Sequence, residues 1–144
     1  MDRISVAERS RTMAQVRSKD TKPEMIVRST LHRLGYRYVL HSRKLVGTPD
    51  LVFPARHKVI FVHGCFWHDH SCKYGQSRPK SNVEYWERKI SGNASRDKRN
   101  IAILRRTGWR VMIIWECDIR KSIWLKKALR FLNDREIHKK FYVS

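Results

Sequence analysis

Ten consecutive residues in the middle of the chain hold an unusual density of potential metal ligands. Residues 63–72, HGCFWHDHSC, contain three histidines and two cysteines, and the remaining cysteine, Cys117, lies much further along the chain. A structural zinc site takes four protein ligands in a tetrahedron. One such set uses every cysteine of the chain, and it consists of Cys65, His70, Cys72 and Cys117. Zinc bound there would join this loop to a distant segment, so the fold would have to bring residue 117 back to it.

An interpretation without metal also exists for this segment. An odd number of cysteines argues against a disulfide framework, and free cysteines are often small buried apolar side chains. The histidines would then be polar groups that face a nucleic acid. The spacing differs from that of a zinc ribbon with two CxxC pairs, so it is the crowding of five potential ligands into a loop without periodicity that favours zinc.

The charge of the chain limits its possible partners. Lys and Arg number 32 and Asp and Glu number 13, which gives a formal net charge of +19. A compact body with this excess repels itself unless it meets a polyanion, so we expect DNA, RNA or an anionic membrane surface as the partner. The first residues hold no apolar segment typical of a signal peptide, and the longest apolar runs, 59–62 and 111–115, are too short to span a membrane. We therefore expect a cytoplasmic nucleic-acid-binding protein.

Turn residues and apolar periodicity predict one α/β domain over residues 1–144. Residues 1–20 are basic and weakly periodic, and we expect them to become ordered on DNA. A helix is predicted to begin at the capping box Thr21-Lys22-Pro23-Glu24 and to end at Gly35. The further predicted elements are strands at 36–40, 50–53 and 58–63, helical stretches at 83–90 and 94–106 that separate near Gly92, a strand at 109–115 buried on both faces, and a last helix carrying Ile123, Leu125, Ala128, Leu129 and Leu132.

Four residues form a possible hydrolytic site. Asp50 begins one strand and His63 ends the next, so an antiparallel pairing would bring them to the same edge of the sheet, where Asp50 could hold Mg²⁺. His68 could be fixed by the metal-bound loop, and Asp97 could hold one of its ring nitrogens and leave the other as a base. The simpler alternatives are a turn-forming aspartate after Pro49 and an ordinary helical salt bridge at Asp97.

Several motifs occur in the same order as in one known family. They lie within residues 9–120 and read SRTMAQVRSKDTKPE, GTPDLVF, VIFVHGCFWHDHSC, NASRDKRN and GWRVMIIWEC. Together they resemble the very-short-patch (Vsr) repair endonucleases. The resemblance implies a restriction-endonuclease-like (PD-(D/E)xK-type) α/β core, in which helices flank a central mixed sheet, together with a structural zinc site.

The resemblance also implies an activity and its partners. It implies a Mg²⁺-dependent endonuclease that nicks one DNA strand 5′ to the thymine of a T:G mismatch, which arises when 5-methylcytosine deaminates. Zn²⁺ is the implied structural metal. We expect the enzyme to act as a monomer on mismatched double-stranded DNA at the bacterial nucleoid, with mismatch-repair proteins and a repair polymerase as further partners and no role for a membrane.

The family's site residues can be placed on this sequence one by one. Asp50 resembles the Mg²⁺-binding aspartate, helped by the main-chain carbonyl of Val62, and His68 resembles the general base. Asp97 is similar to the residue that orients this base. His63 looks like a contact to phosphate or to metal-bound water, and Glu24 like the acidic residue that completes the site. The matched zinc ligands are Cys65, His70, Cys72 and Cys117, and the side chains that would be inserted beside the mispair are Met13, Phe66, Trp67 and Trp86.

Alternatives stay open for Glu24, for the aromatic pair of the loop and for the function as a whole. Glu24 is equally explained as a helix-capping residue, and Phe66 and Trp67 as a small apolar core over the metal. Asp69 stands where the family can have a further histidine. The E-x-K pair of the wider nuclease fold is missing, and His63 stands where it would begin. The alternative functions are a zinc-stabilised DNA-binding module without catalysis and a site-specific or single-strand endonuclease of the same fold.

Overall fold

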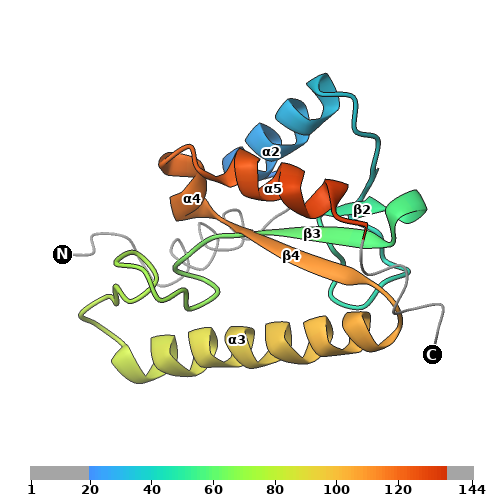
Figure 1. Cartoon of the computed structure of the whole chain (residues 1–144). Coiled ribbons are helices and arrows are strands. Elements are labelled where there is room, and N and C mark those ends of the chain that lie inside the picture. The colour runs from blue at the N-terminus through green and yellow to red at the C-terminus, as the bar shows by residue number, and fades with distance from the viewer. Residues whose placement is uncertain (1–19, 136–144) are drawn as a thin grey trace.

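The computed structural model of the chain describes residues 20–135, and Met13 lies outside them. The elements alternate between helices and strands (Figure 1). In chain order they are α2 (Lys22–Arg33), β1 (Val39–Leu40), β2 (Leu51–Phe53), the 3-10 helix η1 (Pro54–Arg56), β3 (Lys58–His63), α3 (Val83–Arg106), β4 (Arg110–Trp115), α4 (Glu116–Arg120) and α5 (Trp124–Asn133).

The strands form one mixed sheet in the order β1-β2-β3-β4. The β1–β2 and β2–β3 pairs are antiparallel, as predicted for the latter, and β3 and β4 run parallel with Val59 opposite Val111 and His63 opposite Trp115. Helices α2 and α5 cover one face, and the long helix α3 lies along the other (Figure 1). A mixed α/β fold with helices on both faces of the sheet is therefore confirmed.

Alternation along the strands divides the apolar residues between two cores. On the face of α2 and α5, Ile60 and Ile114 pack with side chains of these helices such as Leu31. On the other face, Val59 and Phe61 pack with Leu104 of α3. Strand β4 thus contributes to both cores, but the prediction that it is buried on both faces is only partly right. Most of its side chains are only half-buried, because β4 is the outermost strand on its side of the sheet that the structure describes.

Helix α2 begins where the sequence predicts, with Thr21 as its N-cap. The Oγ1 atom of Thr21 accepts the N–H of Glu24 at 3.4 Å. In a capping box the glutamate side chain would accept the N–H of the N-cap residue. Here the Glu24 carboxylate instead accepts the N–H of the preceding residue, Asp20, at 3.2 Å. Glu24 is buried and the other oxygen of its carboxylate has further partners, so capping accounts for only part of its environment.

Two predictions are wrong: the break near Gly92 and the length of the strand at 36–40. Helix α3 continues through Gly92 without a break, because one glycine costs only about 1 kcal/mol and the helix buries Trp86, Ile90 and Leu104 on either side of it. The last predicted helix is α5, and the short helix α4, which was not predicted, precedes it; Ser122 between them has a left-handed φ of 57°. The strand predicted at 36–40 is reduced to β1.

A buried lysine ties the end of α5 to the sheet. Lys58 of β3 is 2% exposed, and its Nζ atom donates to the main-chain carbonyls of Phe131, Leu132 and Asp134. Burial lowers the pKa of Lys58. Carbonyls at the end of a helix lack intrahelical donors, and this ammonium group supplies one.

Within residues 20–135, none of the helices has the length and apolar character needed to cross a membrane.

Candidate active site and metal centre

A cleft of about 530 Å³ opens beside the end of β3, between the start of α2 and the middle of α3. All five residues predicted to act in catalysis line it: Glu24, Asp50, His63, His68 and Asp97. Val62, Phe66 and Trp67 line it as well. The structure therefore brings together residues from four separate segments of the chain.

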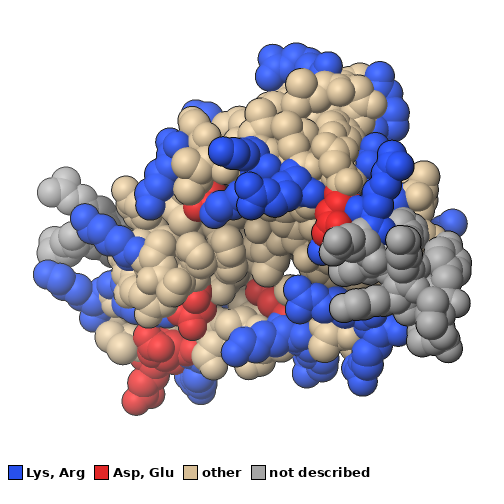
Figure 2. Space-filling view, in the orientation of Figure 1, with Lys and Arg blue, Asp and Glu red and all other residues tan. Residues whose placement is uncertain are grey.

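Lys and Arg side chains gather above and below the centre of the molecule, over α5 and α3 (Figure 2).

Two carboxylates from different elements meet in this cleft. Asp50 precedes β2, and its Oδ2 atom accepts the N–H of Val62 at 2.7 Å. Burial and the neighbouring Glu24 carboxylate together raise the pKa of Asp50 to about 7, although the hydrogen bond from Val62 lowers it. A buried and a half-buried carboxylate that repel each other in this way would be stabilised by a cation. Their hard oxygen atoms are the ligands that Mg²⁺ prefers, so the pair suits a magnesium ion.

A histidine that the sequence analysis missed completes this group. The Nε2 atom of His41 lies 2.6 Å from Oε2 of Glu24 and 4.0 Å from Oδ1 of Asp50. His41 follows the last residue of β1, and β1 pairs with β2 so that residue 41 stands opposite residue 50. From the sequence, the proximity of His41 to Asp50 could be predicted only by pairing the short strand at 39–40 with residues 51–52.

An imidazole–carboxylate pair forms another part of the cleft. Nδ1 of His68 lies 2.6 Å from Oδ2 of Asp97 on α3. The ring of His63 stacks on that of His68 with 3.6 Å between centroids and 6° between planes. Burial lowers the pKa of His63 to about 3, and the charge of His68 contributes to the same shift. His63 is therefore neutral, and its buried Nδ1 atom has no hydrogen-bond partner within the described part of the chain.

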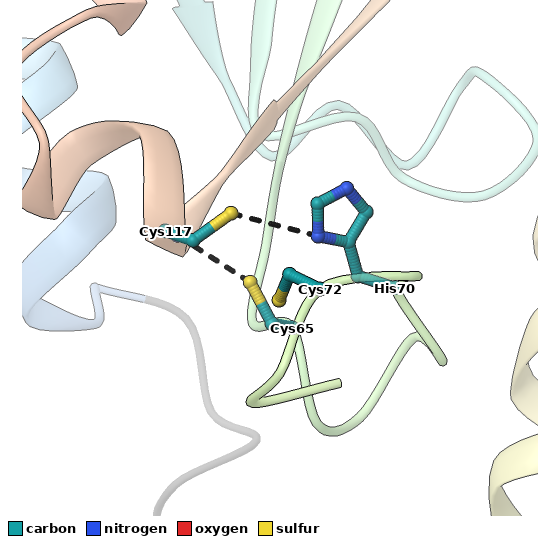
Figure 3. A group of neighbouring side chains, drawn as sticks. All are labelled: Cys65, His70, Cys72 and Cys117. Atoms are coloured by element: carbon teal, nitrogen blue, oxygen red, sulfur yellow. Dashed lines mark hydrogen bonds between the residues drawn. The ribbon is translucent and has the colours of Figure 1, made fainter. Parts of the chain in front are cut away.

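The side chains of Cys65, His70, Cys72 and Cys117 converge outside the cleft (Figure 3). Their possible ligand atoms all lie within 4.8 Å of one another. Cys117 stands at the start of α4, where its N–H donates to Sγ of Cys65 at 3.4 Å and its own Sγ lies 3.5 Å from Nδ1 of His70. The His70 ring stacks on Trp115 with a centroid distance of 4.0 Å. β4 thus returns the third cysteine to the loop.

The chemistry of these donors suits zinc. Burial raises the pKa of Cys65 to about 12, and the nearby thiols of Cys72 and Cys117 also raise it. At Cys72 burial opposes ionisation, but hydrogen bonds from Gly75, His70 and Cys65 lower the pKa to about 6. Three sulfur atoms so close together resist full ionisation unless a cation lies among them. Three thiolates and one imidazole form a usual ligand set for structural Zn²⁺.

Aromatic side chains of the same loop pack against the start of α3. Phe66 and Trp67 lie 5.5 and 6.1 Å from Trp86, measured between ring centroids, and are themselves half-buried. Trp86 is 1% exposed, so it cannot contact a base in this conformation and would first have to be uncovered. The loop is also held by Asn93 of α3, whose Nδ2 atom donates to the carbonyl of Trp67 at 3.0 Å. No motif of the sequence marks Asn93 for this role.

Comparison with known proteins places this geometry in a family. The sequence model of the family described as DNA mismatch endonuclease Vsr matches residues 1–74. A type II nicking enzyme from Xanthomonas oryzae, V.XorIIP, is 51% identical over 133 residues, which are 92% of this chain and 97% of the relative. This chain belongs to the Vsr family. The DNA mismatch endonuclease Vsr of Escherichia coli K12 is 41% identical over 114 residues, 79% of this chain and 72% of the relative. A type II nicking enzyme from Neisseria meningitidis, V.NmeAIP, is 39% identical over 131 residues, 91% of this chain and 93% of the relative.

Membership of the Vsr family makes the chain a DNA endonuclease. The alternative of a zinc-stabilised DNA-binding module without catalysis is therefore wrong. The mixed sheet and the helices on both of its faces agree with the nuclease fold that the family implies.

Proposed function

We propose that this protein is a Mg²⁺-dependent mismatch endonuclease with a structural zinc. It would nick one DNA strand 5′ to the thymine of a T:G mismatch formed by deamination of 5-methylcytosine. One observation carries the proposal: the His68–Asp97 pair, at 2.6 Å, lines the same cleft as Asp50 and Glu24. Phosphodiester hydrolysis needs a base for the attacking water and a positive charge near the phosphate. The cleft offers residues for both.

His68 is the proposed general base. Asp97 can only accept a hydrogen bond when ionised, so it fixes the proton of His68 on Nδ1 and leaves the lone pair of Nε2 for the water. General base catalysis contributes on the order of 10²- to 10⁴-fold to a rate. The His63 ring, stacked on His68 and neutral because of its lowered pKa, would restrain the orientation of the base without placing a second positive charge beside it.

Asp50 is the proposed magnesium ligand, together with the main-chain carbonyl of Val62, and Glu24 is the second acidic residue of the site. Bound Mg²⁺ would stabilise the negative charge that develops on the phosphate. The hydrogen bond from the Val62 N–H holds one oxygen of Asp50 in place. Arg43 and Arg96 line the same cleft and are suitable partners for the DNA phosphates.

Zinc is proposed to be structural, with Cys65, His70, Cys72 and Cys117 as ligands. His68 lies between two of these ligands in the sequence, so a metal that fixes the loop would also fix the base. Phe66 and Trp67, in the same loop, are the proposed side chains that enter the base stack beside the mispair. Unstacking costs a few kcal/mol and costs least at a mismatch, which would favour T:G sites.

A second candidate is a site-specific or single-strand endonuclease on the same fold. Relatives that carry the name type II nicking enzyme favour it. The two candidates differ in the need for a mismatch.

One gel experiment distinguishes these functions. Matched and T:G-mismatched duplexes with randomised flanking bases, and the single strand, are labelled on each strand in turn and incubated with and without Mg²⁺. We expect a nick 5′ to the mismatched thymine only in the mismatched duplex with Mg²⁺. Equal nicking of the matched duplex, or cleavage of the single strand alone, would favour the second candidate, and full activity in a chelator would refute the role of the metal.

A further inference from the structure

His41 makes a short contact with the buried carboxylate of Glu24. Its Nε2 atom lies 2.6 Å from Oε2, while Arg28 reaches the same oxygen at 3.4 Å and the Asp20 N–H reaches Oε1 at 3.2 Å. The side chain of Glu24 is 3% exposed. A buried carboxylate needs donors that replace water. Since an ionised carboxylate can only accept, His41 donates through Nε2.

The backbone fixes His41 with respect to Asp50 as well. The main-chain N–H of His41 donates to the carbonyl oxygen of Asp50 at 3.1 Å. Residue 41 also has a φ of 45°, in the left-handed region that residues other than glycine rarely adopt. Such backbone conformations persist where the surrounding structure holds them, and they occur often at functional sites.

His41 therefore contacts Glu24 through its side chain and Asp50 through its backbone. Its imidazole lines the cleft and lies 4.0 Å from Oδ1 of Asp50. Residues 20–135 also include a histidine with no such placement: His32, on the same helix as Glu24, is exposed and does not line the cleft.

We propose that His41 is a positioning residue, which holds the Glu24 carboxylate beside Asp50 so that the two acidic side chains bind Mg²⁺ together. The proposal rests on the proposed function of the cleft and adds a residue to it. His41 acts through Glu24, and it has no direct role in moving the proton of the attacking water. Partners that orient a metal-binding group in this way typically change metal affinity or activity by about 10- to 100-fold when they are removed.

The test compares H41A with H41Q, and uses H32Q as the matched control. The amide nitrogen of glutamine can take the place of Nε2, so H41Q keeps a donor for Glu24, while H41A does not. Two properties are measured for each full-length variant: the Mg²⁺ concentration that gives half-maximal nicking of a T:G duplex, and Mn²⁺ binding to the protein without DNA, followed by the EPR signal of free Mn²⁺. The second readout does not depend on activity. Wild-type protein in the same assays tests the proposed function of the cleft. A failure of that function is therefore distinguished from a failure of the proposal for His41.

We expect H41A to raise the half-saturating Mg²⁺ concentration and to weaken Mn²⁺ binding by about 10- to 100-fold. H41Q and H32Q should both stay close to wild type. If H41A leaves both quantities unchanged, or if H41A and H41Q lower activity and melting temperature equally with unchanged metal binding, the proposal is overturned.

A double-mutant cycle with E24A provides the second measurement, because H41A alone could lower stability. If His41 works through Glu24, adding H41A to E24A should weaken Mn²⁺ binding by less than about twofold, since the effects of coupled residues do not add. A full further loss in the double variant would show that His41 acts independently of Glu24, and would overturn the proposal.

Discussion

The hydrogen bond between His68 and Asp97 allows the catalytic proposal to be tested quantitatively. At 2.6 Å, with the two side chains 27% and 24% exposed, it is a charge-assisted bond in a partly buried place. Such bonds contribute about 1.5–3 kcal/mol, and the partial exposure places this one toward the lower end. Because about 1.4 kcal/mol corresponds to a tenfold change in rate, Asp97→Asn should slow single-turnover nicking by about 10- to 100-fold.

The same assay separates the orienting residue from the base itself. His68→Ala should slow nicking by about 10²- to 10⁴-fold, because it removes general base catalysis. Glu87→Gln is a control of the same kind, since Glu87 pairs with Arg78 at 3.0 Å and does not line the cleft; it should nick at the wild-type rate. DNA affinity, measured with each variant in the absence of Mg²⁺, should change little. If Asp97→Asn nicks within about twofold of wild type, Asp97 does not orient the base.

Two further predictions concern the metals. Purified protein should contain about one equivalent of zinc by elemental analysis. Cys117→Ala should lose this zinc and much of the free energy of unfolding, because the substitution removes the ligand that joins the loop to the end of β4. Fully folded protein without zinc would contradict this prediction. Asp50→Asn should abolish Mg²⁺-dependent nicking while DNA affinity persists, since affinity depends mainly on Lys and Arg contacts to phosphate; nicking by this variant near the wild-type rate would show that Asp50 is not essential.

The sequence predicted the part of the site that follows strand ends. Asp50 stands at the start of one predicted strand and His63 at the end of the next, so an antiparallel pairing, which β2 and β3 have, was enough to bring them to one edge. The return of Cys117 to residues 65–72 followed from ligand chemistry, because three cysteines and a histidine serve one zinc only if the chain folds back. These inferences depended on the positions of residues in predicted strands and on the number of ligands that zinc takes. Both can be read from the sequence without knowledge of tertiary packing.

The sequence did not predict contacts that depend on tertiary packing. His41 follows a strand of two residues, too short to show alternation, and only its register with β2 places it beside Asp50. Gly92 lies in α3 because burial on both sides of it outweighs its low helix propensity. Asn93 resembles any polar helical residue until its bond to the carbonyl of Trp67 is known.

The aromatic group of the zinc loop keeps two interpretations that make opposite predictions. Phe66 and Trp67 cover Trp86, which is 1% exposed, so a purely structural role predicts that the double variant F66A/W67A loses stability and binds all DNA more weakly. If instead the pair stacks beside the mispair, at about 1–3 kcal/mol for each stacked base, the double variant should lose at least about tenfold in affinity for a T:G duplex and little for the matched duplex. Tyr85→Ala is the control, because Tyr85 also contacts Trp86, with 5.1 Å between centroids, yet is 48% exposed. Fluorescence-anisotropy titrations of both duplexes, with zinc content measured in parallel, decide between the two. Equal losses in both affinities with zinc retained would show that Phe66 and Trp67 form a structural core, and the mismatch would then have to be recognised elsewhere.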